Sequence, residues 1–333
     1  MGKRLTVLAL LLVAFLIRVD AQTRTRNANT PNATLLASLP ESDGLAQVKL
    51  KQLINETMPR LLANNPTKLA EINAELEKFK TKTGIDPRSF DQLALSFRYT
   101  YPAEDITKVK TVALARGSFN PGALVAAGRI AADGQYREEK YLDKTIYIFT
   151  LDENIKLLGL FDFSIKEVAV CALDANTLAI SDPVSIRSVI DVKRNRKRVN
   201  AELIALASRD PNAVIGFGSN MTPQLMRSLK IPNASVANDV SSIRQVYGSV
   251  ATPEANVDIF LAARALNPEA AKNLSDTLEG LKQLGSLFIG RLSGARGVLA
   301  KSALTNLKIA TQANELQIRT SVPQADIAPL FGG

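Results

Sequence analysis

The chain has 333 residues, of which 46% are hydrophobic, and its formal net charge is +9 at pH 7. This length and apolar content are enough for one large or two ordinary domains, and a single cysteine excludes an intramolecular disulfide. The chain contains no histidine, which excludes Ser-His-Asp and Cys-His catalytic arrangements and removes the commonest metal ligand. The positive charge favours an anionic partner or serves solubility alone.

The first 21 residues have the layout of a cleavable signal peptide. Lys3 and Arg4 precede an apolar stretch at residues 5–17, and Ala21 is a small residue at the expected cleavage point. Thirteen helical residues reach about 20 Å, which is too short for the ~30 Å hydrocarbon core of a bilayer. We therefore predict an exported protein, periplasmic or extracellular, with no transmembrane span after signal cleavage. Residues 22–39 are rich in Thr, Asn and Arg and are expected to form a flexible leader.

A recurring sequence pattern predicts where helices begin. A residue that can cap a helix precedes a proline, and a periodic apolar stretch follows the proline. Proline suits the first helical position because the N–H that it lacks would have no partner there. The five instances are Asn65-Pro66, Asn120-Pro121, Asp182-Pro183, Thr222-Pro223 and Asn267-Pro268.

Strands and hairpins are predicted between these helices. Residues 93–99 alternate between apolar and polar side chains, as a half-buried strand does. Three hairpins are expected at residues 136–149, 168–180 and 305–320, with turns at 142–144, 174–176 and 312–314.

Four short segments recur in the same order, which indicates an internal repeat. They match residues 46–50 with 213–217, 92–95 with 245–248, 113–121 with 260–268, and 175–180 with 313–318. We therefore predict an α+β fold of two similar halves, residues 40–192 and 200–333, joined by a basic linker at 193–199. Each half is expected to be a mostly antiparallel sheet with helices packed on one face. The alternative is that strand–helix alternation produces such matches by chance.

Two segments carry a resemblance to known proteins. Thr83-Gly-Ile-Asp-Pro87, just before an alternating strand, and residues 203–214 are similar to features of uncharacterised exported bacterial proteins with duplicated α+β domains. The resemblance spans residues 40–327. It implies a compartment and a fold class, and it implies no catalytic residue.

The most conspicuous local feature is the basic run, which we define as residues 193–198. Five of its six residues are cationic, and they could contact the phosphates of an anionic membrane surface. The simpler interpretation is a solvated linker, because the charges repel one another. The candidate contacts are Lys193, Arg194, Arg196, Lys197 and Arg198.

Other candidates for chemistry are weaker. Glu138-Glu139 and Asp152-Glu153 are paired acids without a third ligand, so we interpret them as solvated strand ends. The segment from Gly216 to Asn220 lacks the lysine of a phosphate-binding loop and is expected to be a strand end and turn. Cys171 lies in an apolar strand and is expected in the core.

These observations favour a non-catalytic exported cell-envelope protein that acts as a binding or interaction module, with an unidentified envelope protein as its partner. The alternative is a periplasmic carrier of an apolar or lipid-like ligand, with the helix at residues 268–292 as a lid over the sheet. No cofactor and no metal are expected, and export argues against a nucleic-acid partner. An enzyme that uses carboxylates or lysine is the least favoured class.

Overall fold

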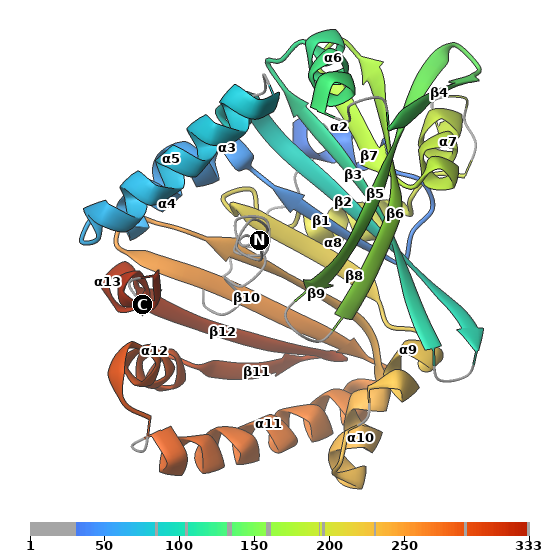
Figure 1. The fold of residues 1–333 in the computed structure, drawn as a ribbon. Coiled ribbons are helices and arrows are strands. Elements are labelled where there is room, and N and C mark those ends of the chain that lie inside the picture. Colours follow the sequence, from blue (N-terminus) through green and yellow to red (C-terminus); the bar gives the residue numbers. More distant parts are fainter. Residues whose placement is uncertain are drawn as a thin grey trace.

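The structure is a computed structural model, and it describes residues 31–83, 86–103, 106–131, 135–157, 161–192, 194, 197–229, 231–289 and 292–331. Within these residues, twelve strands form one antiparallel sheet in the order β11-β12-β10-β9-β8-β1-β2-β3-β7-β6-β5-β4 (Figure 1). The strands are β1 (Gly44–Val48), β2 (Phe90–Ala103), β3 (Ile106–Gly117), β4 (Tyr136–Tyr141), β5 (Lys144–Leu157), β6 (Phe161–Asp174), β7 (Thr177–Ser181), β8 (Ile215–Asn220), β9 (Ile243–Ala251), β10 (Asn256–Ala265), β11 (Lys308–Gln312) and β12 (Glu315–Pro323).

Helices connect and cover these strands, so the α+β class is confirmed. They are α2 (Pro31–Leu36), α3 (Leu50–Gln52), the π-helix η1 (Leu53–Thr57), α4 (Met58–Leu61), α5 (Pro66–Thr83), the 3-10 helix η2 (Pro87–Ser89), α6 (Pro121–Ala131), α7 (Pro183–Val192), α8 (Ala201–Ala207), α9 (Pro223–Ser228), α10 (Ala234–Ser241), α11 (Pro268–Phe288), α12 (Gly294–Thr305), α13 (Gln324–Ile327) and the 3-10 helix η4 (Ala328–Phe331).

All five predicted helix caps are present. The side chain of each capping residue accepts a hydrogen bond from a backbone N–H in the first helical turn, and Asn267 Oδ1 accepts from Ala270 N at 2.8 Å. The others are Asn65, Asn120, Asp182 and Thr222. These bonds satisfy N–H groups that have no partner inside the helix, so local sequence alone sets where these helices begin.

The three predicted hairpins are also present. Each turn leaves two residues between the last paired positions of its strands, as between Tyr141 and Lys144 and between Gln312 and Glu315. The first turn residue has a positive φ in two of them, 56° at Leu142 and 52° at Ala313. Turns of this handedness match the twist of the strands that they join.

The sheet has two faces, which can be assigned from the pairing register because paired residues point to the same side. We call the face that α8 covers the α8 face. On it, one row of paired residues crosses five strands, and all five residues are essentially buried: Ala94, Leu114, Ala179, Cys171 and Ile146. Helices α2, α7 and α8 supply the rest of this main core. On the opposite face, the α11 face, smaller clusters pack beneath α4 and α10 to α13.

Helices therefore cover both faces, and the prediction of helices on one face is wrong. Part of the predicted leader is helical, because α2 spans Pro31–Leu36. Leu35 and Leu36 in α2, together with Leu39, are at most 1% exposed against the sheet. Three leucines in a five-residue stretch bury enough apolar surface to hold a short helix that has little intrinsic stability.

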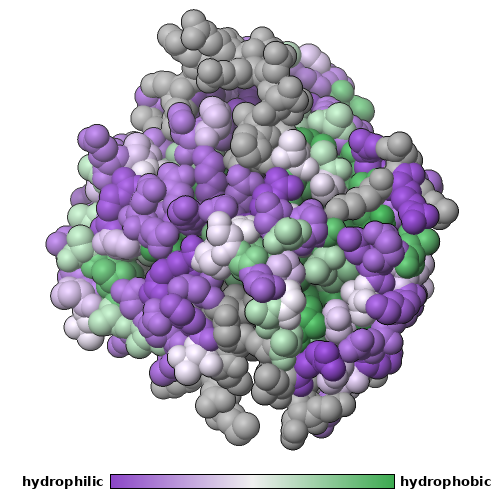
Figure 2. Space-filling model, turned by 90° about the horizontal axis from the view of Figure 1, so that it is seen from above, coloured by the Kyte–Doolittle hydropathy of each residue, from purple (hydrophilic) through white to green (hydrophobic). Residues whose placement is uncertain are grey.

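The two halves share a single sheet. Strand β1 pairs with β8 from Gly44↔Ser219 to Val48↔Ile215, so the sheet continues from one half into the other. Outward from this junction the strand order is β1-β2-β3-β7 on one side and β8-β9-β10-β12 on the other. Viewed from above, the molecule has a mainly hydrophilic surface interrupted by small apolar areas (Figure 2).

Candidate functional site

The α8 face is covered unevenly. In the first half, α7 packs Ile186, Val189 and Ile190 into the core over β3, β5, β6 and β7. In the second half, the helices that pack on β10, β11 and β12 are α11, α12 and α13, and their apolar side chains join clusters on the other face. Within the described residues, no helix is packed on the α8 side of these three strands.

The composition of the sheet changes accordingly along a single row of paired residues. Beyond Ala94 the row continues through Gln47, Gly216, Ser249, Phe260, Arg319 and Lys308. It thus runs from buried apolar residues under α7 to charged residues at the far edge. We call the second part the open face, defined by the α8-side residues of β10, β12 and β11: Asp258, Phe260, Ala262, Arg264, Glu315, Gln317, Arg319, Ser321, Lys308, Ala310 and Gln312.

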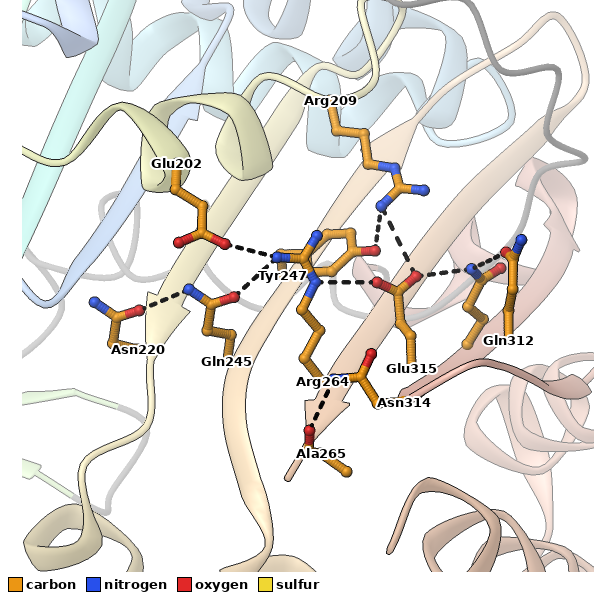
Figure 3. A network of polar contacts seen from close by, with 11 residues as sticks. Glu202, Arg209, Asn220, Gln245, Tyr247, Arg264, Ala265, Gln312, Asn314 and Glu315 are labelled. Carbon is orange, nitrogen blue, oxygen red and sulfur yellow. Dashed lines mark hydrogen bonds and ion pairs between the residues drawn. The ribbon is translucent and has the colours of Figure 1, made fainter. Parts of the chain in front are cut away.

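Tyr247 lies at the inner border of the open face, where β9 passes under α8 (Figure 3). Its side chain is fully buried, and the Arg209 and Arg264 guanidinium groups lie over its ring, 5.0 and 5.6 Å from the centroid. Arg209 also donates a short hydrogen bond to the Tyr247 hydroxyl. A guanidinium stacked on an aromatic ring gains cation–π attraction and loses rotational freedom.

Glu315 is the central acidic residue of a network of polar contacts that also includes Arg209, Tyr247 and Arg264 (Figure 3). We call it the open-face network. The Oε2 of Glu315 accepts a hydrogen bond from Arg264 Nε at 3.2 Å, its Oε1 accepts from Gln317 Nε2 at 2.8 Å, and Arg209 Nη1 lies 3.8 Å from Oε1. The Tyr247 hydroxyl is a further hydrogen-bond partner. Its side chain is only 12% exposed. A carboxylate this well enclosed holds both arginines in fixed positions.

Arg264 extends the network toward α8 and β8. Its Nη1 donates to Glu202 Oε1 at 2.8 Å and to Gln245 Oε1 at 3.0 Å. Gln245 Nε2 in turn donates to Asn220 Oδ1 at 3.0 Å. The network therefore joins residues of α8, β8, β9, β10 and β12.

This arrangement shifts the pKa of Tyr247 and the pKa of Glu315 in opposite directions. Burial, reinforced by the neighbouring Glu315 carboxylate, raises the pKa of Tyr247 well above its ordinary value. Burial alone would raise the pKa of Glu315, but the hydrogen bonds from Tyr247, Gln317 and Arg264 and the charge of Arg209 together hold it below the ordinary value. At neutral pH Tyr247 is thus a neutral phenol and Glu315 a fully paired carboxylate. Neither is placed to exchange protons with a substrate.

The outer part of the network offers cationic groups instead. Arg319 lies 4.9 Å and Arg209 lies 5.8 Å from the centroid of the Phe260 ring. Within the part of the chain that the structure describes, the Nε and Nη2 of Arg209 have no hydrogen-bond partner. Its side chain is 41% exposed. Guanidinium donors held in this way can bind an anionic group.

Three residues of the predicted basic run, Arg194, Lys197 and Arg198, are among the described residues. Lys197 lies 3.9 Å from Glu41 Oε2, and the Arg198 backbone pairs with Pro40. Arg194 follows α7 instead and lines a cavity of about 280 Å³ with Asp143, Lys144, Leu173 and Ile190. Lys193 and Arg196 lie outside the described residues.

The weaker candidates have structural partners. Glu139 accepts two hydrogen bonds from Arg187, which lower the pKa of the carboxyl. Gly216 in β8 lies directly beneath α8, where a Cβ would come within 2.1 Å of the Ala207 carbonyl oxygen. Cys171 is buried in the core, as expected. The side chains of Asp152 and Glu153 lie outside the described ones.

The open-face network could not be predicted from the sequence, because its residues lie far apart along the chain. Arg209 lies within residues 203–214, and Tyr247, Arg264 and Glu315 lie in the recurring segments 245–248, 260–268 and 313–318, none of which carries a chemical motif. Residues this far apart in sequence converge only through the pairing of β9, β10 and β12.

A scan against protein-family models finds no match, and a search of curated proteins also finds none. Among solved structures, the chain is similar to TP0453 in several crystal forms. Form III matches at a TM-score of 0.45 and 9% identity, over 90% of this chain and 98% of that one. Form I gives 0.44 and 10%, over 89% and 96%. A likeness this distant concerns the overall fold alone.

The described residues contain no group of three or more Cys, Asp or Glu side chains that could hold a metal ion. No helix among them is long and apolar enough to span a membrane. The carrier alternative requires a cavity beneath α11. Of the two best-defined cavities, one is the space beside Arg194 and the other is a gap of about 10 Å³ beside Leu35 and Gln47. Neither is lined by α11.

Proposed function

We propose that this chain is a non-catalytic, exported cell-envelope protein whose open face binds an acidic segment of another envelope protein. The observation that carries the proposal is the open face itself. It is the α8 side of three strands on which no helix of the described residues packs, and its arginines Arg264 and Arg319 lie over aromatic rings. Arginine and aromatic residues are enriched at protein interfaces.

The electrostatics support an acidic partner. Glu315 and Glu202 are already paired with arginines inside the network, whereas Arg209 keeps unused donors and Lys308 has no ion-pair partner among the described residues. A carboxylate that approaches Arg209 gains charge-assisted hydrogen bonds. Because stacking on Tyr247 has already ordered the guanidinium, little side-chain entropy is lost on binding.

We also infer that the halves at residues 40–192 and 200–333 arose by duplication. The matching strand orders on the two sides of the β1–β8 junction support this inference. Helices α2 and α8 precede equivalent strands, and the open face is equivalent to the surface that α7 covers in the first half. The corresponding helix after β12, α13, packs instead on the α11 face against α4 and α12. Duplication followed by the loss of one covering helix accounts for a polar, partly exposed surface on which no described helix packs.

Site-specific photocrosslinking in the native host tests the proposed function. Ala310 and Thr311 are adjacent exposed residues of β11 that point to opposite faces, so each is the control for the other. A photoreactive residue at Ala310 is expected to crosslink to a distinct envelope protein, and one at Thr311 is not. Arg209→Gln should weaken the adduct at Ala310. Equal adducts from both positions, or none from Ala310, would refute a partner on the open face.

A further inference from the structure

The end of the α11–α12 helical pair exposes an unusual concentration of leucines. We call residues 281–289 and 292–298 the α11–α12 tip. Leu281, Leu284, Leu292 and Val298 are 48%, 54%, 55% and 53% exposed. The described part of the chain exposes nine large hydrophobic residues, and four of the nine fall in this short stretch. Singly exposed apolar residues are ordinary, but a cluster of them marks a contact surface.

The exposure follows from the length of α11. Its first half packs Ala271, Leu274 and Leu278 against β10, β11 and β12. A helix of 21 residues is about 30 Å long, so its second half continues past these contacts. There α11 meets α12 at Gly285, next to Leu304, while the side chains of Leu281 and Leu284 stay exposed to solvent.

Two glycines constrain the backbone at the start of α12. Gly294 has a φ of +67°, a conformation that residues with a Cβ rarely adopt. At Gly297 a Cβ would come within 2.2 Å of the Leu292 carbonyl oxygen, so only glycine permits this close contact. The close contact of Gly297 with the Leu292 backbone fixes the position of the exposed Leu292 relative to the first turn of α12.

The charge of this region has one sign. Residues 280–314 contain no Asp or Glu, although the whole chain has 32 acidic residues. The same stretch contains five cations: Lys282, Arg291, Arg296, Lys301 and Lys308. Arg296 and Lys301 are exposed and have no ion-pair partner in the part of the chain that the structure describes. A second copy of the same tip would be repelled, so a symmetric contact between tips is disfavoured.

We propose that the α11–α12 tip docks on an anionic lipid surface. Leu284, Leu292 and their neighbours enter the boundary between headgroups and acyl chains, and Arg296 and Lys301 contact lipid phosphates. Exposed leucines beside unpaired cations are the features by which amphipathic helices bind bilayers peripherally. Each cation near an anionic surface adds to the attraction. This contact is separate from the open face, and it holds or fails independently of the proposed partner protein.

Flotation of the exported protein with lipid vesicles tests this inference. Protein is recovered from the periplasm of an expression host, and mass spectrometry verifies that the N-terminal signal is absent. Vesicles contain either phosphatidylcholine alone or phosphatidylcholine with 30 mol% phosphatidylglycerol. The wild type should bind the anionic vesicles, less at high salt. Leu284→Ser with Leu292→Ser, and separately Arg296→Gln with Lys301→Gln, should each lower the partition coefficient at least tenfold.

Matched controls separate the tip from other surfaces. Val184→Ser with Leu266→Ser removes two exposed apolar residues elsewhere, and the triple variant Arg194→Gln, Lys197→Gln, Arg198→Gln removes three of the five charges of the basic run. Both controls should bind like the wild type. The proposal is overturned if the wild type does not bind anionic vesicles, if the tip variants bind unchanged, or if only the basic-run variant loses binding. It is also overturned if the tip substitutions instead dissociate a dimer measured by light scattering.

Discussion

Replacing Glu315 by glutamine tests whether the open-face network is a fixed structural unit. The substitution keeps the shape of the side chain and removes its charge. One oxygen remains an acceptor, but the new amide N–H₂ faces donors of Tyr247, Gln317 or the arginines. Hydrogen bonds to a charged group contribute about 1.5–3 kcal/mol each, and breaking a fully buried ion pair costs about 3–5 kcal/mol.

The magnitude for this site is smaller than that of a fully buried pair. The side chains of Arg209 and Arg264 are 41% and 31% exposed, so water compensates part of the loss. Arg264 also keeps Glu202 and Gln245 as partners. We therefore expect Glu315→Gln to lower the free energy of unfolding by about 2 kcal/mol.

Urea denaturation followed by circular dichroism measures this difference. The matched control is Glu167→Gln, which removes the charge of a solvent-exposed pair with Arg137 and is expected to change stability far less, because water screens exposed pairs. If Glu315→Gln is no more destabilising than this control, the network does not hold the two arginines as argued. A changed slope with unchanged midpoint would likewise contradict the reasoning.

The pH dependence supplies a second check on Glu315. Because the pKa of this carboxyl is lower in the folded state than its ordinary value of 4.5, its contribution to stability is fully present above that value. The contribution is lost as the pH falls through the folded-state pKa. The stability difference between wild type and Glu315→Gln should therefore be constant from pH 5 to 8 and shrink in acid. A difference that persists unchanged into strong acid would show that the charge is not responsible.

Three further predictions concern the core and the tyrosines. Gly216→Ala should cost about 3 kcal/mol of stability in urea denaturation, because its Cβ would overlap the Ala207 carbonyl beneath α8; an unchanged midpoint would mean that α8 does not press on β8. Cys171 should react with a thiol reagent only after unfolding, since it is fully buried; rapid labelling of the native protein would place it elsewhere. Burial raises the pKa of both Tyr247 and Tyr99, so in an ultraviolet titration these two should ionise above the ordinary tyrosine value of about 10, and stability should fall as the pH rises through that range. Ionisation of Tyr247 and Tyr99 at the ordinary value would contradict this.

Local features of the fold could be predicted because they depend on neighbours in sequence. Asn267 caps α11 and Asp182 caps α7 through hydrogen bonds that span three residues. The hairpin turns at Leu142 and Ala313 are likewise determined within a few residues. The amphipathic period of a helix and the alternation of a strand are written in the chain itself. The export signal at residues 1–21 stays a prediction, since it lies outside the described residues.

The tertiary structure decided how these pieces come together. The pairing of β1 with β8 makes one sheet of two expected ones, and nothing in either short strand specifies its partner. Which side of a strand meets a helix depends on register, and a shift of one residue exchanges the two faces. The same ambiguity hid the network of Arg209, Tyr247, Arg264 and Glu315. The sequence by itself thus determined the α+β class, the helix starts and the turns, because these are set by contacts between near neighbours. Only the tertiary structure decided which faces are covered and where the arginines gather, because those depend on contacts between residues far apart in the chain.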